Sequence, residues 1–158
     1  MGTNPTKAAG NIYCRCRKEA AKYNDKLSSR EGAAELLGIS PSTLADYELD
    51  ITKIIPADNI LRMADLYNAP EIRNYYCKNC CPLGTDVPEV RIGELDRITV
   101  RALASLRSVS KVRENLLDIT EDGRITEEEK PVLEEIIQNL DELSAIAQSL
   151  KAWTEKNM

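Results

Sequence analysis

The stretch that decides the fold is SREGAAELLGISPSTLADYE, residues Ser29–Glu48. Ser29 and Ser40 are good helix N-caps, because a serine hydroxyl accepts one of the free amide hydrogens at a helix start. Gly38 follows the last apolar residues of the first segment, where a helix commonly ends in a left-handed residue. Pro41 suits the first position of a helix, since its missing N–H is not needed there. The stretch predicts two short helices joined by a tight turn.

Helical patterns continue on both sides of this pair. Residues Ile12–Tyr23 precede it as one helix, and Pro56–Tyr67 follow it with apolar residues at helical spacing. Pro70 then opens a last short helix. The fold class is therefore all-α, and residues 1–81 are predicted to form an N-terminal domain of five helices.

The order of these elements resembles the helix-turn-helix domain of phage repressor and Cro proteins, often called the XRE family. The matching residues are Ala34 in the first helix of the pair, Gly38–Ser40 in the turn, and Leu44 and Glu48 in the second helix. The resemblance covers roughly residues 11–80, about half of the chain. It implies that the second helix enters the DNA major groove and that the partner is double-stranded DNA.

The resemblance also implies one ion pair, and the chain departs from the family's pattern at one position. In such domains the glutamate that ends the second helix usually pairs with an arginine of the first helix of the domain, which here is Arg15 or Arg17. Family members commonly have glycine two residues after that glutamate, whereas this chain has Asp50. Because aspartate tolerates the left-handed conformation better than most residues, we expect the turn to survive.

The predicted DNA-contacting residues carry little positive charge. The groove-facing set is Ser40, Pro41, Ser42, Thr43 and Asp46. Backbone amides at the start of the helix suit a phosphate, and an aspartate can accept from cytosine N4. Arg30 and Lys53 are the candidates for phosphate contacts, which set register rather than sequence. The alternative for both cations is an ordinary solvated surface charge.

The charge is unevenly distributed along the 158 residues, whose net charge is −5. Residues 1–80 hold 11 basic against 10 acidic side chains, and residues 81–158 hold 10 against 16. The acidic second half is therefore expected to face solvent or a protein partner rather than DNA. A nearly neutral first half predicts weak binding by a monomer and a need for dimerisation.

The sequence offers no support for an enzyme. Histidine is absent, and no glycine-rich phosphate loop is present, so neither a hydrolytic triad nor a nucleotide cofactor is expected. The first ten residues, MGTNPTKAAG, lack the apolar segment of a secretory signal, and no run is apolar enough to cross a membrane. We therefore expect a cytoplasmic protein without a cofactor.

The second half predicts a long antiparallel helical hairpin. Residues 82–93, PLGTDVPEVRIG, are rich in Pro and Gly and are predicted to form a linker. In residues 94–158, apolar residues recur every three or four positions from Leu95 to Leu117 and again from Leu133 to Leu150. Because two helices alone bury little surface, the hairpin is expected either to pair with a second copy or to fold back on the first domain.

The segment between these two helices is close to a calcium-binding EF-hand loop. Its candidate ligands are Asp118, Thr120, Asp122 and Glu129, with Gly123 at the turn. Thr120 stands where a carboxylate or amide is wanted, so one ligand is weak. The alternative explains the same residues without metal: a turn at Gly123, then a capping box formed by Thr126 and Glu129.

The cysteines offer a second, weaker metal hypothesis. Cys14, Cys77, Cys80 and Cys81 would supply thiolates to zinc if the first and fifth helices met in space. Cys16 is two residues from Cys14 and points to another face of the helix. The alternative is a set of reduced cysteines that act as small hydrophobic residues.

Three functions follow from these patterns. The favoured one is a sequence-specific DNA-binding regulator, a dimeric repressor of phage or mobile-element type. The second is a protein-interaction adaptor on a helix-turn-helix fold that binds DNA weakly or not at all. The third is a metal sensor that uses the EF-hand-like loop or the cysteines.

Overall fold

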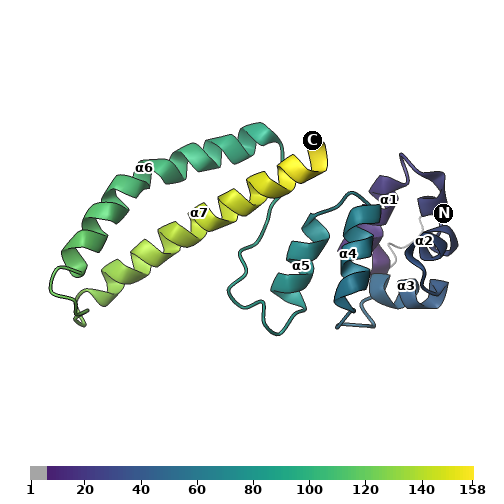
Figure 1. Ribbon diagram of the computed structural model, residues 1–158, viewed down its shortest axis with the longest axis horizontal. Helices are drawn as coiled ribbons and strands as arrows, with labels where there is room; N and C mark the ends of the chain where they lie inside the picture. Colours follow the sequence, from purple (N-terminus) through teal and green to yellow (C-terminus); the bar gives the residue numbers. More distant parts are fainter. Residues whose placement is uncertain (1–6) are drawn as a thin grey trace. The chain divides into compact units, whose positions relative to one another are not determined.

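The computed structural model describes residues 7–158, and its regular structure is entirely helical over that range, which confirms the all-α prediction. The chain divides into two compact units, Met1–Val87 and Pro88–Met158 (Figure 1). Among the described helices, none combines the length and the apolar character needed to span a membrane.

The first unit is a bundle of short helices (Figure 1). They are α1 (Ile12–Ala20), α2 (Arg30–Leu37), α3 (Pro41–Glu48), α4 (Ala57–Leu66) and α5 (Glu71–Asn79), with 3-10 turns at Lys7–Gly10 and Asp25–Ser28. Leu27, Leu44, Met63 and Ile72 are fully or almost fully buried between them. One apolar core therefore holds all of these elements together.

Helix α1 is shorter than predicted, because it ends at Ala20 and not at Tyr23. Tyr23 is 92% exposed. The reason is local: the extended backbone of Asn24 leaves the helix, and its side chain accepts from the Lys26 amide to cap the following 3-10 turn. At the other end Asn11 caps α1, since its Oδ1 accepts from the Tyr13 amide at 2.8 Å.

The second unit consists of two long helices, α6 (Leu95–Ile119) and α7 (Lys130–Asn157), which lie side by side in Figure 1. Arg101 pairs with Glu142 at 2.7 Å, and Lys111 pairs with Glu135 at 2.8 Å. From the first of these ion pairs to the second, the residue number rises in α6 and falls in α7, so the two helices run in opposite directions. Their buried apolar cluster is small, with Val112, Ile119 and Ile136 at its centre.

Helix α7 begins at Lys130, four residues later than the predicted start at Thr126. The capping hydrogen bonds are nevertheless present, because the amide and hydroxyl of Thr126 both donate to Glu129 at 2.8 Å. Pro131 supplies the physical reason. Because it has no N–H, it cannot donate the backbone hydrogen bond that would extend the helix toward its N-terminus.

Candidate nucleic-acid interface

The helix pair α2–α3 is built by the caps that the sequence predicts. The Ser29 hydroxyl accepts from the Gly32 amide at 3.1 Å, and the Ser40 hydroxyl accepts from the Thr43 amide at 3.0 Å. Gly38 has φ 70°, the left-handed conformation expected of it. Ala34 is fully buried beneath the pair. These four local predictions are confirmed, and together they present the start of α3 to solvent.

Gly32 has a role that the sequence analysis missed. A Cβ on this residue would overlap the backbone carbonyl of Lys26, in the 3-10 turn that packs against α2. The glycine therefore permits a close approach of two backbone segments. Its position inside a predicted helix is the signal that pointed to such a contact.

We expect Gly32→Ala to lower the free energy of unfolding by about 1–3 kcal/mol, because the added methyl forces backbone atoms apart. Thermal unfolding followed by circular dichroism measures the change. Gly10→Ala is the matched control, since a Cβ there meets nothing within 4 Å. Equal melting temperatures for the two variants would contradict the packing argument.

The exposed start of α3 is a cluster of hydroxyl groups. The Ser40 Oγ lies 2.9 Å from the Ser42 Oγ and 2.7 Å from the Thr43 Oγ1. Pro41 is exposed beside them, and Asp46 is half-buried one turn further along. Hydroxyls both donate and accept, so this surface suits contacts with phosphates and base edges without supplying positive charge.

The two candidate phosphate-binding cations have different surroundings. Lys53 is exposed, with its Nζ 3.6 Å from an Asp50 carboxylate oxygen. Arg30 is about one-third exposed, and its Nε donates to the buried Glu48 at 2.7 Å. Lys53 is therefore a surface charge, whereas Arg30 also has a structural bond. The Asp50 turn has φ 64°, which confirms the left-handed conformation expected for it.

Glu48 holds α3 to the rest of the first unit through a buried ion pair. Its carboxylate is fully buried and receives the Nε of Arg17 at 2.6 Å and the Nη2 of Arg17 at 3.1 Å. Arg17 also donates to the carbonyl of Leu27 at 2.9 Å. Of the two arginines that the family resemblance offered, Arg17 is thus the partner, while Arg15 is exposed. Burial alone raises the pKa of Glu48, but the hydrogen bonds from Arg17 and Arg30 outweigh it and lower that pKa.

Two asparagines, also missed, tie α3 to its neighbours. Asn11, ahead of α1, donates to the Tyr47 carbonyl at 3.1 Å, and Asn59 of α4 donates to the Tyr47 hydroxyl at 3.0 Å. An asparagine just before an apolar helical run is a recognisable cap, but the contact with Tyr47 comes from a distant part of the chain. These bonds restrict how α3 can tilt on the core.

The EF-hand-like ligand set is not assembled. Thr120 donates to the Leu116 carbonyl at 2.6 Å, Asp122 accepts from the Arg124 amide at 2.9 Å, and Glu129 accepts from Thr126. Across residues 7–158 no group of three or more metal-ligating side chains, and hence no group that includes Asp118, is gathered in one place. In this structure the oxygen atoms serve turns and caps instead.

The candidate zinc ligands are not gathered in one place either. Cys14 is buried beside Arg17 and Glu48, Cys77 is exposed, and Cys80 and Cys81 are half-buried, with no cluster of three in the described chain. Burial raises the pKa of Cys14 and of Cys80. A raised pKa favours the neutral thiol over the thiolate that binds zinc.

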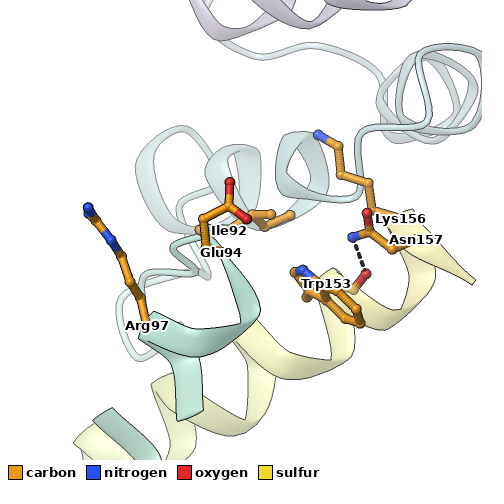
Figure 2. Close-up of a pocket in the computed structure, with 7 residues that line it drawn as sticks. Ile92, Glu94, Arg97, Trp153, Lys156 and Asn157 are labelled. Carbon is orange, nitrogen blue, oxygen red and sulfur yellow. Dashed lines mark hydrogen bonds between the residues drawn. The ribbon is translucent and has the colours of Figure 1, made fainter. Parts of the chain in front are cut away.

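A pocket of about 520 Å³ lies in the second unit, between the start of α6 and the end of α7. Its lining includes Glu94, Arg97, Trp153 and Lys156. Figure 2 shows the side chains of Arg97 and Lys156 both extending away from the Trp153 ring. None of the predicted DNA-contacting residues lines this pocket.

Comparison with known proteins bears on the first unit. A family model described as helix-turn-helix matches residues 25–72, which run from the 3-10 turn before α2 to the start of α5. No curated protein and no solved structure matches the chain. The matched segment contains both helices of the motif, Gly32 and the buried Glu48. The match therefore supports an XRE-type helix-turn-helix domain at residues 25–72 and, with it, a DNA-binding transcriptional regulator.

Proposed function

We propose that the protein is a sequence-specific DNA-binding repressor of phage or mobile-element type, located in the cytoplasm or on the nucleoid, and that it acts as a dimer. The observation that carries the proposal is the exposed start of α3, a helix that the buried ion pair Glu48–Arg17 joins to α1. In this arrangement Ser40, Ser42 and Asp46 face base edges of the major groove. We assign no catalytic role to any residue.

The scarcity of cations at this surface argues for a dimer. Lys53 and Arg30 are the phosphate contacts we assign to each protomer, and so small a set releases few counterions. Two protomers on two half-sites would double the contacts and restore useful affinity. We assign dimerisation to the α6–α7 hairpin, whose own apolar cluster is small.

Selection from a random pool of duplex DNA at low salt tests the proposal. We expect the retained sequences to share a twofold-symmetric motif with half-sites about one helical turn apart. Retention without a motif would leave a non-specific DNA binder. No retention at any salt concentration would overturn the assignment as a DNA-binding regulator.

Lys53→Gln and Ser42→Ala separate backbone contact from base contact. We expect Lys53→Gln to weaken binding to all duplexes alike and to reduce the salt slope by about 1, because one phosphate contact is lost. Ser42→Ala should change the preferred sequence while the salt slope stays the same. Fluorescence anisotropy across a salt series measures both. Lys53 is a cleaner probe than Arg30, whose replacement also removes a bond to Glu48.

A second candidate function is a protein-interaction adaptor. The observation that favours it is the charge that α3 presents to solvent, since the helix carries Asp46 there but no lysine or arginine. An adaptor would show no linear fall in log affinity with log salt concentration, because only binding to nucleic acid releases condensed counterions. The same salt series therefore distinguishes the two functions.

A further inference from the structure

The α6–α7 hairpin has one polar side and one apolar side. The ion pairs Arg101–Glu142 and Lys111–Glu135 mark the polar side. Leu106 is five residues from both Arg101 and Lys111, and Leu140 is five residues from Glu135, which places each leucine about 140° around its helix from those ion pairs. Leu106 is 57% exposed and Leu140 is 47% exposed. The apolar side of the hairpin therefore faces outward.

This apolar side extends along both helices. Its large exposed side chains are Leu103, Leu106, Val109, Leu116 and Leu117 on α6 and Ile137, Leu140 and Leu150 on α7. Helix α6 has 25 residues and is about 37 Å long, and two packed helices are about 20 Å wide. The side thus offers roughly 700 Å², close to the roughly 800 Å² that each partner contributes to a stable interface.

The two helices carry opposite charge. Helix α6 has five lysines or arginines against three acidic residues, whereas α7 has three against five. Arg113 is seven residues from Leu106 and therefore lies within the apolar row of α6, and Arg107 lies beside that row. Glu134 and Asp141 lie beside the row of α7. All four side chains are exposed, and within residues 7–158 none of them forms an ion pair. Each helix therefore presents charged side chains within or beside the apolar side.

We propose that this side binds a second copy of the chain, with α6 of each protomer packed on α7 of its partner. Two twofold arrangements bring the apolar sides together. One places α6 on α6 and would bring together two helices that each carry net positive charge, which like charges disfavour. The other places Arg107 and Arg113 opposite the partner's α7, which carries net negative charge, and the same contact is repeated by symmetry. The opposite net charges of α6 and α7 therefore select the arrangement in which unlike helices meet.

The arrangement has a consequence for the rest of the chain. When α6 packs on the partner's α7, the twofold axis runs along the helices, so both copies of α6 begin at the same end of the four-helix bundle. Packing of α6 on α6 would place those two starts at opposite ends. The inference rests on the proposed function only for the statement that the hairpin is the dimer interface.

Charge reversal distinguishes the two arrangements. We expect Arg107→Glu with Arg113→Glu to raise the dimer dissociation constant about tenfold at low salt, because α6 and the partner's α7 would then both be acidic. Adding Glu134→Lys and Asp141→Lys in the same chain should restore the affinity. The control is Arg15→Glu with Lys18→Glu, which makes the same change in net charge on exposed residues of α1. Sedimentation equilibrium measures each dissociation constant.

Every outcome has a defined meaning. If α6 packs on α6, the two arginine-to-glutamate changes replace one contact between like charges with another, so the dissociation constant should stay nearly the same. The wild-type dimer should then also tighten with added salt. Either result would overturn the proposed arrangement of the helices, although the protein would still be a dimer. A wild-type chain that stays monomeric overturns the inference and the proposed dimer together. Because no DNA is present, a failure of the protein to bind DNA does not affect the measurement.

Discussion

Replacing Glu48 with glutamine is expected to lower the free energy of unfolding of the first unit by about 3–5 kcal/mol. Glutamine has nearly the same shape but no charge, so the buried Arg17 guanidinium loses its counterion and keeps its desolvation penalty. The α3 helix also loses its link to Arg30. Chemical denaturation followed by circular dichroism measures the change.

Two further variants sharpen this test. Glu35→Gln removes a glutamate that is largely exposed and pairs with Lys26 at 3.6 Å, so it should change stability by less than about 1 kcal/mol. Arg17→Met combined with Glu48→Gln should cost less than the sum of the single changes, because no buried charge is left unpaired. Additive costs would show that the two side chains do not depend on each other.

The same ion pair predicts a response to acid. The pKa of Glu48 in the folded protein is below its ordinary value of 4.5, because the hydrogen bonds from the two arginines outweigh burial. Its stabilising contribution is therefore fully present above pH 4.5 and is lost as the pH falls through the lowered pKa. The stability difference between wild type and Glu48→Gln should shrink over that acid range. A difference independent of pH would contradict the assignment.

Leu106→Glu should raise the dimer dissociation constant about 100-fold or more. Burying a leucine side chain contributes about 1.5–3 kcal/mol, and the twofold symmetry removes two of them at once. Because Leu106 is 57% exposed in the protomer, the helix itself should remain folded. Sedimentation and circular dichroism together test both statements.

Leu83→Glu is the matched control, since Leu83 is 91% exposed outside the hairpin. It should leave the dimer unchanged. If Leu106→Glu leaves the dimer intact as well, the apolar side of the hairpin is not the interface. If Leu106→Glu also weakens binding to the selected DNA motif, that result supports the need for two protomers.

The sequence by itself determined the features that depend on neighbours within a few residues. The serine caps of α2 and α3, the left-handed turns at Gly38 and Asp50, and the 25-residue length of α6 all follow from such local bonds and spacing. The same locality explains two errors. Asn24 and Pro131 each changed a helix boundary, and both residues were visible in the sequence.

Only the tertiary structure decided the contacts between distant residues. It selected Arg17 rather than Arg15 as the partner of Glu48, and it brought the Lys26 carbonyl against Gly32. It also used the oxygen atoms of the EF-hand-like loop for caps and did not gather three of the cysteines around one point within the described residues. Such contacts depend on how whole helices pack. Once one face of a helix packs against the core, the directions of all its side chains are set together. The spacing of apolar residues along the chain does not predict which packing forms, because many packings satisfy the same apolar periodicity.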